Sequence, residues 1–153
     1  MTSIKIEQGD LVVVCDGRKA LILENIGDDI FPNFRTREVH EQDVPKTREL
    51  GTDAPGRSGN SVDQARSAME QTDWHTLEEQ RFLQALVGRL DAALGAGETS
   101  CFTIVAPPRA LGVIRASYSP NLKKAVRDEI DKDLVRLPVY EIEKHLTGKA
   151  SAA

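Results

Sequence analysis

A glycine-rich segment, residues 49–61, carries the residue types best suited to contacting a phosphate. Within it Arg57 lies between Gly56 and Ser58, and Arg66 follows a few residues later. Glycine permits backbone conformations closed to other residues, and a guanidinium can donate two parallel hydrogen bonds to a phosphate. Because long irregular segments inside compact domains are usually functional or disordered, we expect a loop that contacts RNA or another phosphate here.

The loop arginine also has a structural interpretation. Arg57 could pair with Asp53 or Asp63, which lie on either side of it in the sequence. Such a surface ion pair would hold the loop closed without any ligand. Both interpretations of this loop stay open.

Arg109 is a second candidate for phosphate binding. It follows an apolar strand expected at 101–106 and the pair Pro107-Pro108, and proline suits the first turn of a helix. A helix that begins there directs free backbone amides beyond the end of the strand, and Arg109 would add its guanidinium. The alternative is an arginine solvated at a helix start, and this choice also stays open.

Other polar clusters do not form a recognisable catalytic or metal site. Asp131 and Asp133 alternate like a magnesium-binding pair, but Lys132 separates them and no third ligand is evident, so we favour a solvated turn. The histidines lack metal-like spacing; they are His40, His75 and His145. No nucleophile elbow, P-loop or paired-cysteine motif occurs. We predict no catalytic residue, metal ion or cofactor.

Length and composition indicate a globular protein. The chain has 153 residues, of which 40% are hydrophobic and 29% charged, and we expect one domain over 1–146 with a frayed tail at 147–153. A net charge of −4 argues against a protein that coats nucleic acid by charge alone, and no DNA partner is expected. A local basic patch remains compatible with this charge.

Cysteine usage and hydropathy predict a cytoplasmic location. Cys15 and Cys101 each lie in an apolar run, so we expect buried, reduced thiols rather than a disulfide. The sequence has no apolar run of about 18 residues that could span a membrane. Its first residues lack the apolar core of a signal peptide, and no membrane partner is expected.

The N-terminal forty residues are expected to form an antiparallel meander. Residues 11–15 are a continuous apolar run typical of a buried strand, an Asp-Gly pair favours a hairpin turn, and 19–24 form the return strand. Residues 30–40 are predicted as a third strand at the sheet edge, because Pro32 interrupts them and apolar positions are sparse.

The remaining chain alternates helices with strands. A capping box at Thr76 and Glu79 predicts the start of the main helix. Residues 41–73 show no convincing periodicity of apolar residues. Residues 123–131 fit strand and helix spacing equally well. The other predicted elements are a helix ending near 95, a strand at 101–106 and helices at 108–118 and 139–146.

If 123–131 is a strand, the order is β-β-β-α-β-α-β-α. This order predicts an α/β protein with a mixed sheet and helices on its faces, as in ribonuclease H-like folds. Nucleases of that fold bind two metal ions with carboxylates from the first strand, the first helix and the end of the fourth strand. Asp16 and Glu78 or Glu79 could supply the first two, but 105–109 contains no carboxylate. Nuclease activity is therefore not expected.

Several blocks in the same order resemble the bacterial host attachment protein family, whose description is "protein required for attachment to host cells". The blocks are 13–20, 49–58, 81–82, 105–112 and 129–134. The family is similar to the central domain of archaeo-eukaryotic peptide release factors, which implies the ribonuclease H-like arrangement. The resemblance also favours a strand at 123–131.

Release factors carry a Gly-Gly-Gln loop between the third strand and the long helix, and its glutamine places the water that hydrolyses peptidyl-tRNA. Residues 49–61 occupy that interval but contain no Gly-Gly-Gln, and Gln64 is not preceded by glycines. The resemblance therefore implies a cytoplasmic, non-catalytic factor that associates with the ribosome, tRNA or other RNA, and 49–61 would be its contact element.

Two other functions remain open. The loop could serve a hydrolase that acts on peptidyl-tRNA or another ester. Alternatively, the chain could be a protein-interaction module that affects host-cell attachment indirectly. A basic face around Arg57, Arg66 and Arg109 would support RNA, whereas a neutral apolar groove would support a protein partner.

Overall fold

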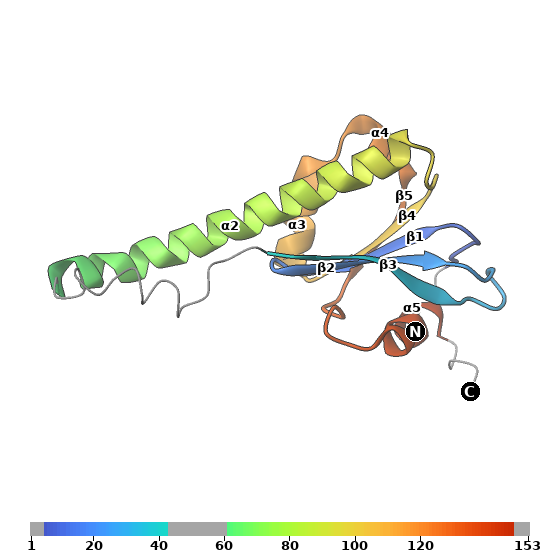
Figure 1. Ribbon diagram of the computed structural model, residues 1–153, viewed down its shortest axis with the longest axis horizontal. Coiled ribbons are helices and arrows are strands. Elements are labelled where there is room, and N and C mark those ends of the chain that lie inside the picture. Colours follow the sequence, from blue (N-terminus) through green and yellow to red (C-terminus); the bar gives the residue numbers. More distant parts are fainter. Residues whose placement is uncertain (1–4, 43–60, 149–153) are drawn as a thin grey trace.

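The computed structural model describes residues 5–42 and 61–148, with side chains in the second segment described from residue 75 onward. Figure 1 shows one layer of strands, with α2, α3 and α4 over one face and α5 under the other. The elements in chain order are β1 (Leu11–Cys15), β2 (Lys19–Asn25), β3 (Phe34–Glu41), α2 (Ser61–Gly95), β4 (Phe102–Ala106), α3 (Pro108–Ser117), α4 (Pro120–Ala125), β5 (Val126–Asp131) and α5 (Val139–Thr147).

The strands of the described part form one five-stranded sheet in the order β3-β2-β1-β4-β5. β2 is antiparallel to both β1 and β3, whereas β4 is parallel to both β1 and β5. This arrangement confirms the predicted mixed α/β fold with helices on the faces of the sheet. The strand order is compatible with the ribonuclease H-like expectation.

Both faces of the central strands are buried, which explains their continuous apolar sequences. Residues two apart on a strand share a face. Val13 belongs to the core layer that includes Leu86 and Leu90 of α2, whereas its neighbour Val12 belongs to the layer that includes Ile142 of α5. A single run of valines on β1 therefore joins the two layers.

Helix α2 is longer than the sequence pattern predicts. It begins at Ser61 and spans 35 residues, a length of about 50 Å. Figure 1 shows its N-terminal part running beyond the sheet, and among its side chains described from residue 75 onward the first buried apolar one is Leu83. Apolar periodicity reports only the part of a helix that packs on a core, so the projecting part gives no signal. The capping-box prediction at Thr76 is wrong, because Thr76 lies inside the helix.

The ambiguous segment 123–131 contains both predicted structures. Its first residues belong to α4, where the Ser119 hydroxyl caps the helix by accepting a hydrogen bond from the amide of Leu122 (3.0 Å). The chain then becomes strand β5 at Val126. The predicted order therefore lacks one short helix: the observed order is β-β-β-α-β-α-α-β-α.

One predicted turn is confirmed, and the ends of two predicted elements differ from the expectation. The hairpin turn is confirmed, since the Asp16 amide donates to the Lys19 carbonyl (2.9 Å). β3 is an edge strand as predicted but begins at Phe34, because the preceding residues form a turn. Thr147, placed in the tail by the sequence, is buried in the last turn of α5, and 149–153 lie outside the described residues.

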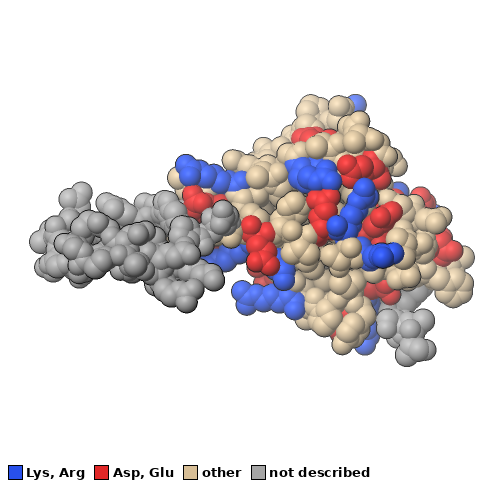
Figure 2. Space-filling model, in the orientation of Figure 1, with Lys and Arg blue, Asp and Glu red and all other residues tan. Residues whose placement is uncertain are grey.

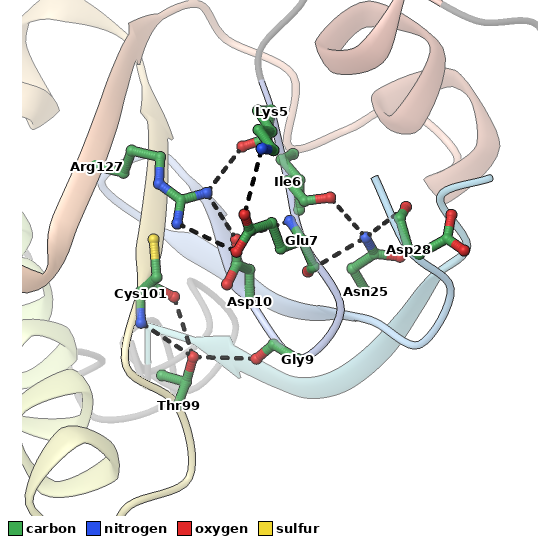
Figure 3. A network of polar contacts seen from close by, with 10 residues as sticks. All are labelled: Lys5, Ile6, Glu7, Gly9, Asp10, Asn25, Asp28, Thr99, Cys101 and Arg127. Carbon is green, nitrogen blue, oxygen red and sulfur yellow. Dashed lines mark hydrogen bonds and ion pairs between the residues drawn. The ribbon is translucent and has the colours of Figure 1, made fainter. Parts of the chain in front are cut away.

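A polar network holds the amino-terminal end of β1 (Figure 3). Asp10 is buried, and its Oδ2 accepts hydrogen bonds from the Glu7 amide (2.9 Å) and from Nη1 of Arg127 (3.0 Å). The Thr99 hydroxyl lies nearby and donates to the carbonyl of Gly9 (3.0 Å). These contacts join β5 and the segment before β4 to the start of the chain.

Asn25 organises the turn that leads into β3. Its side chain is fully buried, and Nδ2 donates to carbonyl oxygens that include those of Ile6 (3.0 Å) and Asp28 (3.2 Å). Its Oδ1 accepts from the amides of Gly27 (3.0 Å) and Asn33 (2.9 Å). A buried polar group that loses such partners costs free energy, so this one side chain stabilises the whole turn.

We predict that Asn25→Ala lowers the free energy of unfolding by about 3 kcal/mol, because it leaves buried amides and carbonyls without partners. The measurement is equilibrium unfolding in urea. Asn33→Ala is the matched control, since Asn33 is exposed and lies in the same turn. Equal destabilisation by both substitutions would contradict the role given to Asn25.

Candidate functional site

A cleft lies at the carboxyl ends of β1 and β4, between α2 and α3. In open α/β sheets, ligands bind outside the carboxyl ends of the strands, so this is the expected position for a site. The cavity has a volume of about 140 Å³. Its lining residues are Gly17, Thr76, Glu79, Gln80, Leu83, Pro107, Arg109, Ala110 and Val113.

Arg109 lies in the first turn of α3, at the edge of the cleft. Pro107 is the N-cap residue and Pro108 occupies the first turn, and neither supplies a side chain that caps the helix amides. Nη2 of Arg109 donates a hydrogen bond to Oγ1 of Thr76 on α2 (3.0 Å). The helix start and the guanidinium both contribute positive charge at this end of the cleft, whereas Glu79 adds a carboxylate to its lining.

The hairpin turn between β1 and β2 forms the opposite wall of the cleft. A Cβ atom at Gly17 would lie 2.8 Å from Cδ of Glu79, so a larger residue would force the glutamate to move. Oδ1 of Asp16 accepts hydrogen bonds from the amides of Arg18 (2.8 Å) and Lys19 (2.9 Å). The Asp16 carboxylate, considered as a nuclease ligand, therefore serves the turn.

A second hollow lies on the other side of this turn and has a volume of about 460 Å³. Cationic residues line it from two distant parts of the chain: Arg18 and Lys19 come from the turn, and Arg136 comes from the segment before α5. Asp16 and Glu41 lie among them. Figure 2 shows Lys and Arg side chains, with carboxylates between them, at this end of the described surface.

The structure places only part of the predicted phosphate-binding set. Arg109 lies at the cleft, and α2 contains Arg66, whose side chain is outside the described residues. Gly56, Arg57 and Ser58 also lie outside the described residues, as does the loop 49–61 up to the start of α2.

Sequence reasoning missed the second group of cations at this end. Arg18, Lys19 and Arg136 meet because the β1–β2 turn and the segment before α5 lie at the same end of the sheet. The hairpin signal located the first two residues on a turn, but nothing in the sequence pattern places Arg136 beside them.

The described residues do not assemble a metal-binding or thiol centre. Among residues 5–42 and 75–148, no group of three or more His, Cys, Asp or Glu side chains could hold a metal ion. Cys15 ends β1 close to the cleft, but its side chain is fully buried, and burial raises the pKa of its thiol to about 12. Burial also raises the pKa of Cys101. Both thiols are therefore protonated and poorly nucleophilic near neutral pH.

Fold and cleft together define a mixed α/β protein whose candidate site lies at the carboxyl ends of parallel strands. Residues 11–146 match the family described as "Protein required for attachment to host cells", and the chain belongs to this family. This match confirms the family resemblance predicted from the sequence blocks. A comparison with curated proteins gives no match.

The described helices of this chain differ from membrane-spanning helices in length or in apolar character. Within the described part of the chain, none combines the length and the apolar character that crossing a membrane requires. The apolar residues of α2 instead form a stripe that packs on the sheet, as the positions of Leu83, Leu86 and Leu90 show.

We predict that neither thiol of the folded protein reacts with a disulfide reagent at pH 8 on the timescale of free cysteine. The cause is burial, which keeps Cys15 protonated and inaccessible. Unfolding in guanidinium chloride should release both thiols, and mass spectrometry of the labelled peptides identifies each site. Rapid labelling of Cys15 in the folded protein would contradict the buried position.

Proposed function

We propose that the protein is a cytoplasmic, non-catalytic factor that contacts the phosphate backbone of ribosomal or transfer RNA. Arg109 and the start of α3 form the central contact, and Arg18, Lys19 and Arg136 extend it. The loop 49–61 supplies a further contact through Gly56, Arg57 and Ser58, together with Arg66. Host-cell attachment, which the family description states, would then depend on the protein indirectly.

The observation that carries this proposal is the distribution of arginines without carboxylate partners. In the described part of the chain, four arginines form no salt bridge: Arg18, Arg109 and Arg136 line the hollows at the carboxyl ends of the strands, and Arg35 lies on the edge strand β3. By contrast, Arg89 pairs with Glu38 and Glu98 elsewhere on the surface. Guanidinium groups that no carboxylate neutralises attract the anionic phosphate backbone of RNA.

The geometry of Arg109 supports a phosphate contact. Its hydrogen-bond partner, the Thr76 hydroxyl, is neutral, so the hydrogen bond orients the guanidinium without cancelling its charge. Proline has no N–H, and the Leu111 amide already donates to the Pro107 carbonyl, so the free amides at this helix start are those of Arg109 and Ala110. A phosphate oxygen placed there could accept from both kinds of donor.

The chain order gives additional support. The segment 49–61 precedes the long helix α2, and in release factors the corresponding interval enters the peptidyl-transferase centre. The absence of Gly-Gly-Gln from the sequence removes the chemistry of peptide release, but it leaves a contact role possible. The net charge of −4 limits this role to a local patch rather than a uniformly basic surface.

We predict that Arg109→Ala weakens binding to single-stranded RNA by about tenfold at low salt. The slope of the logarithm of the binding constant against the logarithm of the salt concentration should become shallower by about 0.7, the value for one lost phosphate contact. Fluorescence anisotropy with a labelled oligouridylate measures both quantities. The RNA affinity of Arg109→Lys should fall between those of the unsubstituted protein and Arg109→Ala, because lysine keeps the charge but lacks the planar guanidinium.

Arg35→Ala provides the matched control for this experiment. Arg35 is an exposed arginine on β3 that, like Arg109, forms no salt bridge among the described residues. It lies opposite Glu24 in the strand register, at the other end of the sheet, so its loss should leave RNA binding unchanged. Sedimentation with purified ribosomes at moderate salt gives the second measurement. Absence of RNA binding and of cofractionation, or equal losses in the two variants, would refute the proposal.

A further inference from the structure

The cleft between α2 and α3 contains an acidic side chain that a phosphate contact alone does not explain. Glu79 lines the cleft and is partly buried, and its side chain lies against Gly17 of the hairpin turn. Among the described residues its carboxylate forms no ion pair and no hydrogen bond. A carboxylate only accepts hydrogen bonds, and it repels a phosphate. Its position beside Arg109 suits a ligand that presents hydrogen-bond donors as well as an anionic group.

The rest of the cleft lining is mainly apolar. Leu83 and Ala110 are buried, and Pro107 and Val113 are partly buried. These residues come from α2, from α3 and from the junction between β4 and α3, so apolar groups border the cleft on both helices. Proteins that enclose a single nucleobase pack apolar side chains against its faces and read its edge with polar groups. The lining of this cleft provides both kinds of contact.

The size of the cleft limits what can enter it. Its volume of about 140 Å³ is that of about five water molecules. Pockets that enclose a whole drug-sized ligand usually measure about 300–1,000 Å³. A nucleobase therefore suits these dimensions, whereas its sugar and phosphate must stay outside. Arg109 and the free amides at the start of α3 lie at the edge of the cleft, where they can meet that phosphate.

We infer that the cleft binds a guanine base, in a nucleotide whose phosphate contacts Arg109. The Watson–Crick edge of guanine presents two adjacent donors, N1–H and the N2 amino group, and the two oxygens of Glu79 can accept from both. Adenine, cytosine and uracil each place an acceptor beside their donor, and that acceptor would face the carboxylate. The Gln80 amide also lines the cleft and can donate to O6 of guanine. This base preference rests on the proposed phosphate contact and adds selectivity to it.

Fluorescence anisotropy with labelled oligouridylates that carry one central guanosine, inosine or adenosine tests the base preference. We expect the guanosine oligonucleotide to bind about tenfold more tightly than the adenosine one, the discrimination given by a good bidentate pair. The affinity for inosine should lie between them, because inosine keeps N1–H but lacks the N2 amino group. Equal affinities for the three would overturn the guanine site. The proposed function would survive that result if Arg109→Ala still weakened binding to oligouridylate.

Glu79→Gln tests the acceptor. Glutamine keeps the shape of the side chain but replaces one acceptor oxygen with a donor, so the preference for guanosine over adenosine should fall to about twofold or less. Affinity for plain oligouridylate should stay equal or rise, because a negative charge is lost. Urea unfolding curves show whether the variant is folded.

Glu78→Gln is the matched control for this substitution. It makes the same charge change on the neighbouring residue of α2, which pairs with Arg81 (3.0 Å) and does not line the cleft. The guanosine preference should therefore persist in Glu78→Gln. If the two variants kept the same preference, Glu79 would act only through its charge, and the guanine site would be overturned.

Free nucleotides distinguish the two sources of a guanine base. Guanosine 5′-monophosphate should displace the labelled guanosine oligonucleotide at about tenfold lower concentration than adenosine 5′-monophosphate does. The unlabelled oligonucleotide should be the stronger competitor, because it adds further phosphate contacts. Stronger competition by guanosine 5′-monophosphate would support the guanine site but refute the RNA contact. If neither the oligonucleotides nor the free nucleotides bound, both proposals would be refuted.

Discussion

The parallel pairing of β1 with β4 is the contact on which the remaining structure depends. The N-terminal meander and the helical half of the chain meet through this pairing, which runs from Leu11 opposite Phe102 to Val14 opposite Val105. β1 is buried on both faces and hydrogen-bonded on both edges, so its apolar run supplies both core layers. The same pairing aligns the carboxyl ends of the two strands and sets the hairpin turn opposite the start of α3. Without that alignment, Gly17 and Arg109 would not border one cleft.

The two ends of the sheet differ in the partners of their main polar groups. At the amino-terminal end of β1, charged and polar groups satisfy one another: Asp10 binds Arg127, and Asn25 fills the turn before β3. At the carboxyl end, the guanidinium of Arg109 meets a neutral hydroxyl, and Arg18 lies at the edge of an open hollow. Satisfied buried networks stabilise a fold, whereas unneutralised cations in a cleft suit a ligand. The proposed RNA contact therefore lies at the end of the sheet away from the Asp10 and Asn25 networks.

Much of the fold was accessible from residue patterns, and the errors have physical causes. The strands at 11–15 and 101–106 are recognisable because burial on both faces demands unbroken apolar runs. The sequence pattern places the start of α2 at Thr76, whereas the helix begins at Ser61. A helical segment that projects beyond the sheet needs no regular spacing of apolar residues, so such spacing does not reveal it. The segment 123–131 looked ambiguous because a helix ends and a strand begins within it, at Val126. Arg109 was found because a proline pair after a strand predicts a helix start.

Local patterns along the chain indicated the family, most of the strands and helices, and the position of Arg109 at a helix start, but not the short helix α4. The tertiary structure sets what surrounds that arginine: Thr76 from α2, Gly17 from the hairpin turn and, beyond the turn, Arg136. It also brings Glu79 of α2 and Ala110 of α3 into one cleft. Local propensity and burial periodicity describe neighbours in sequence, whereas a cleft is made by segments that meet only when the sheet order is fixed.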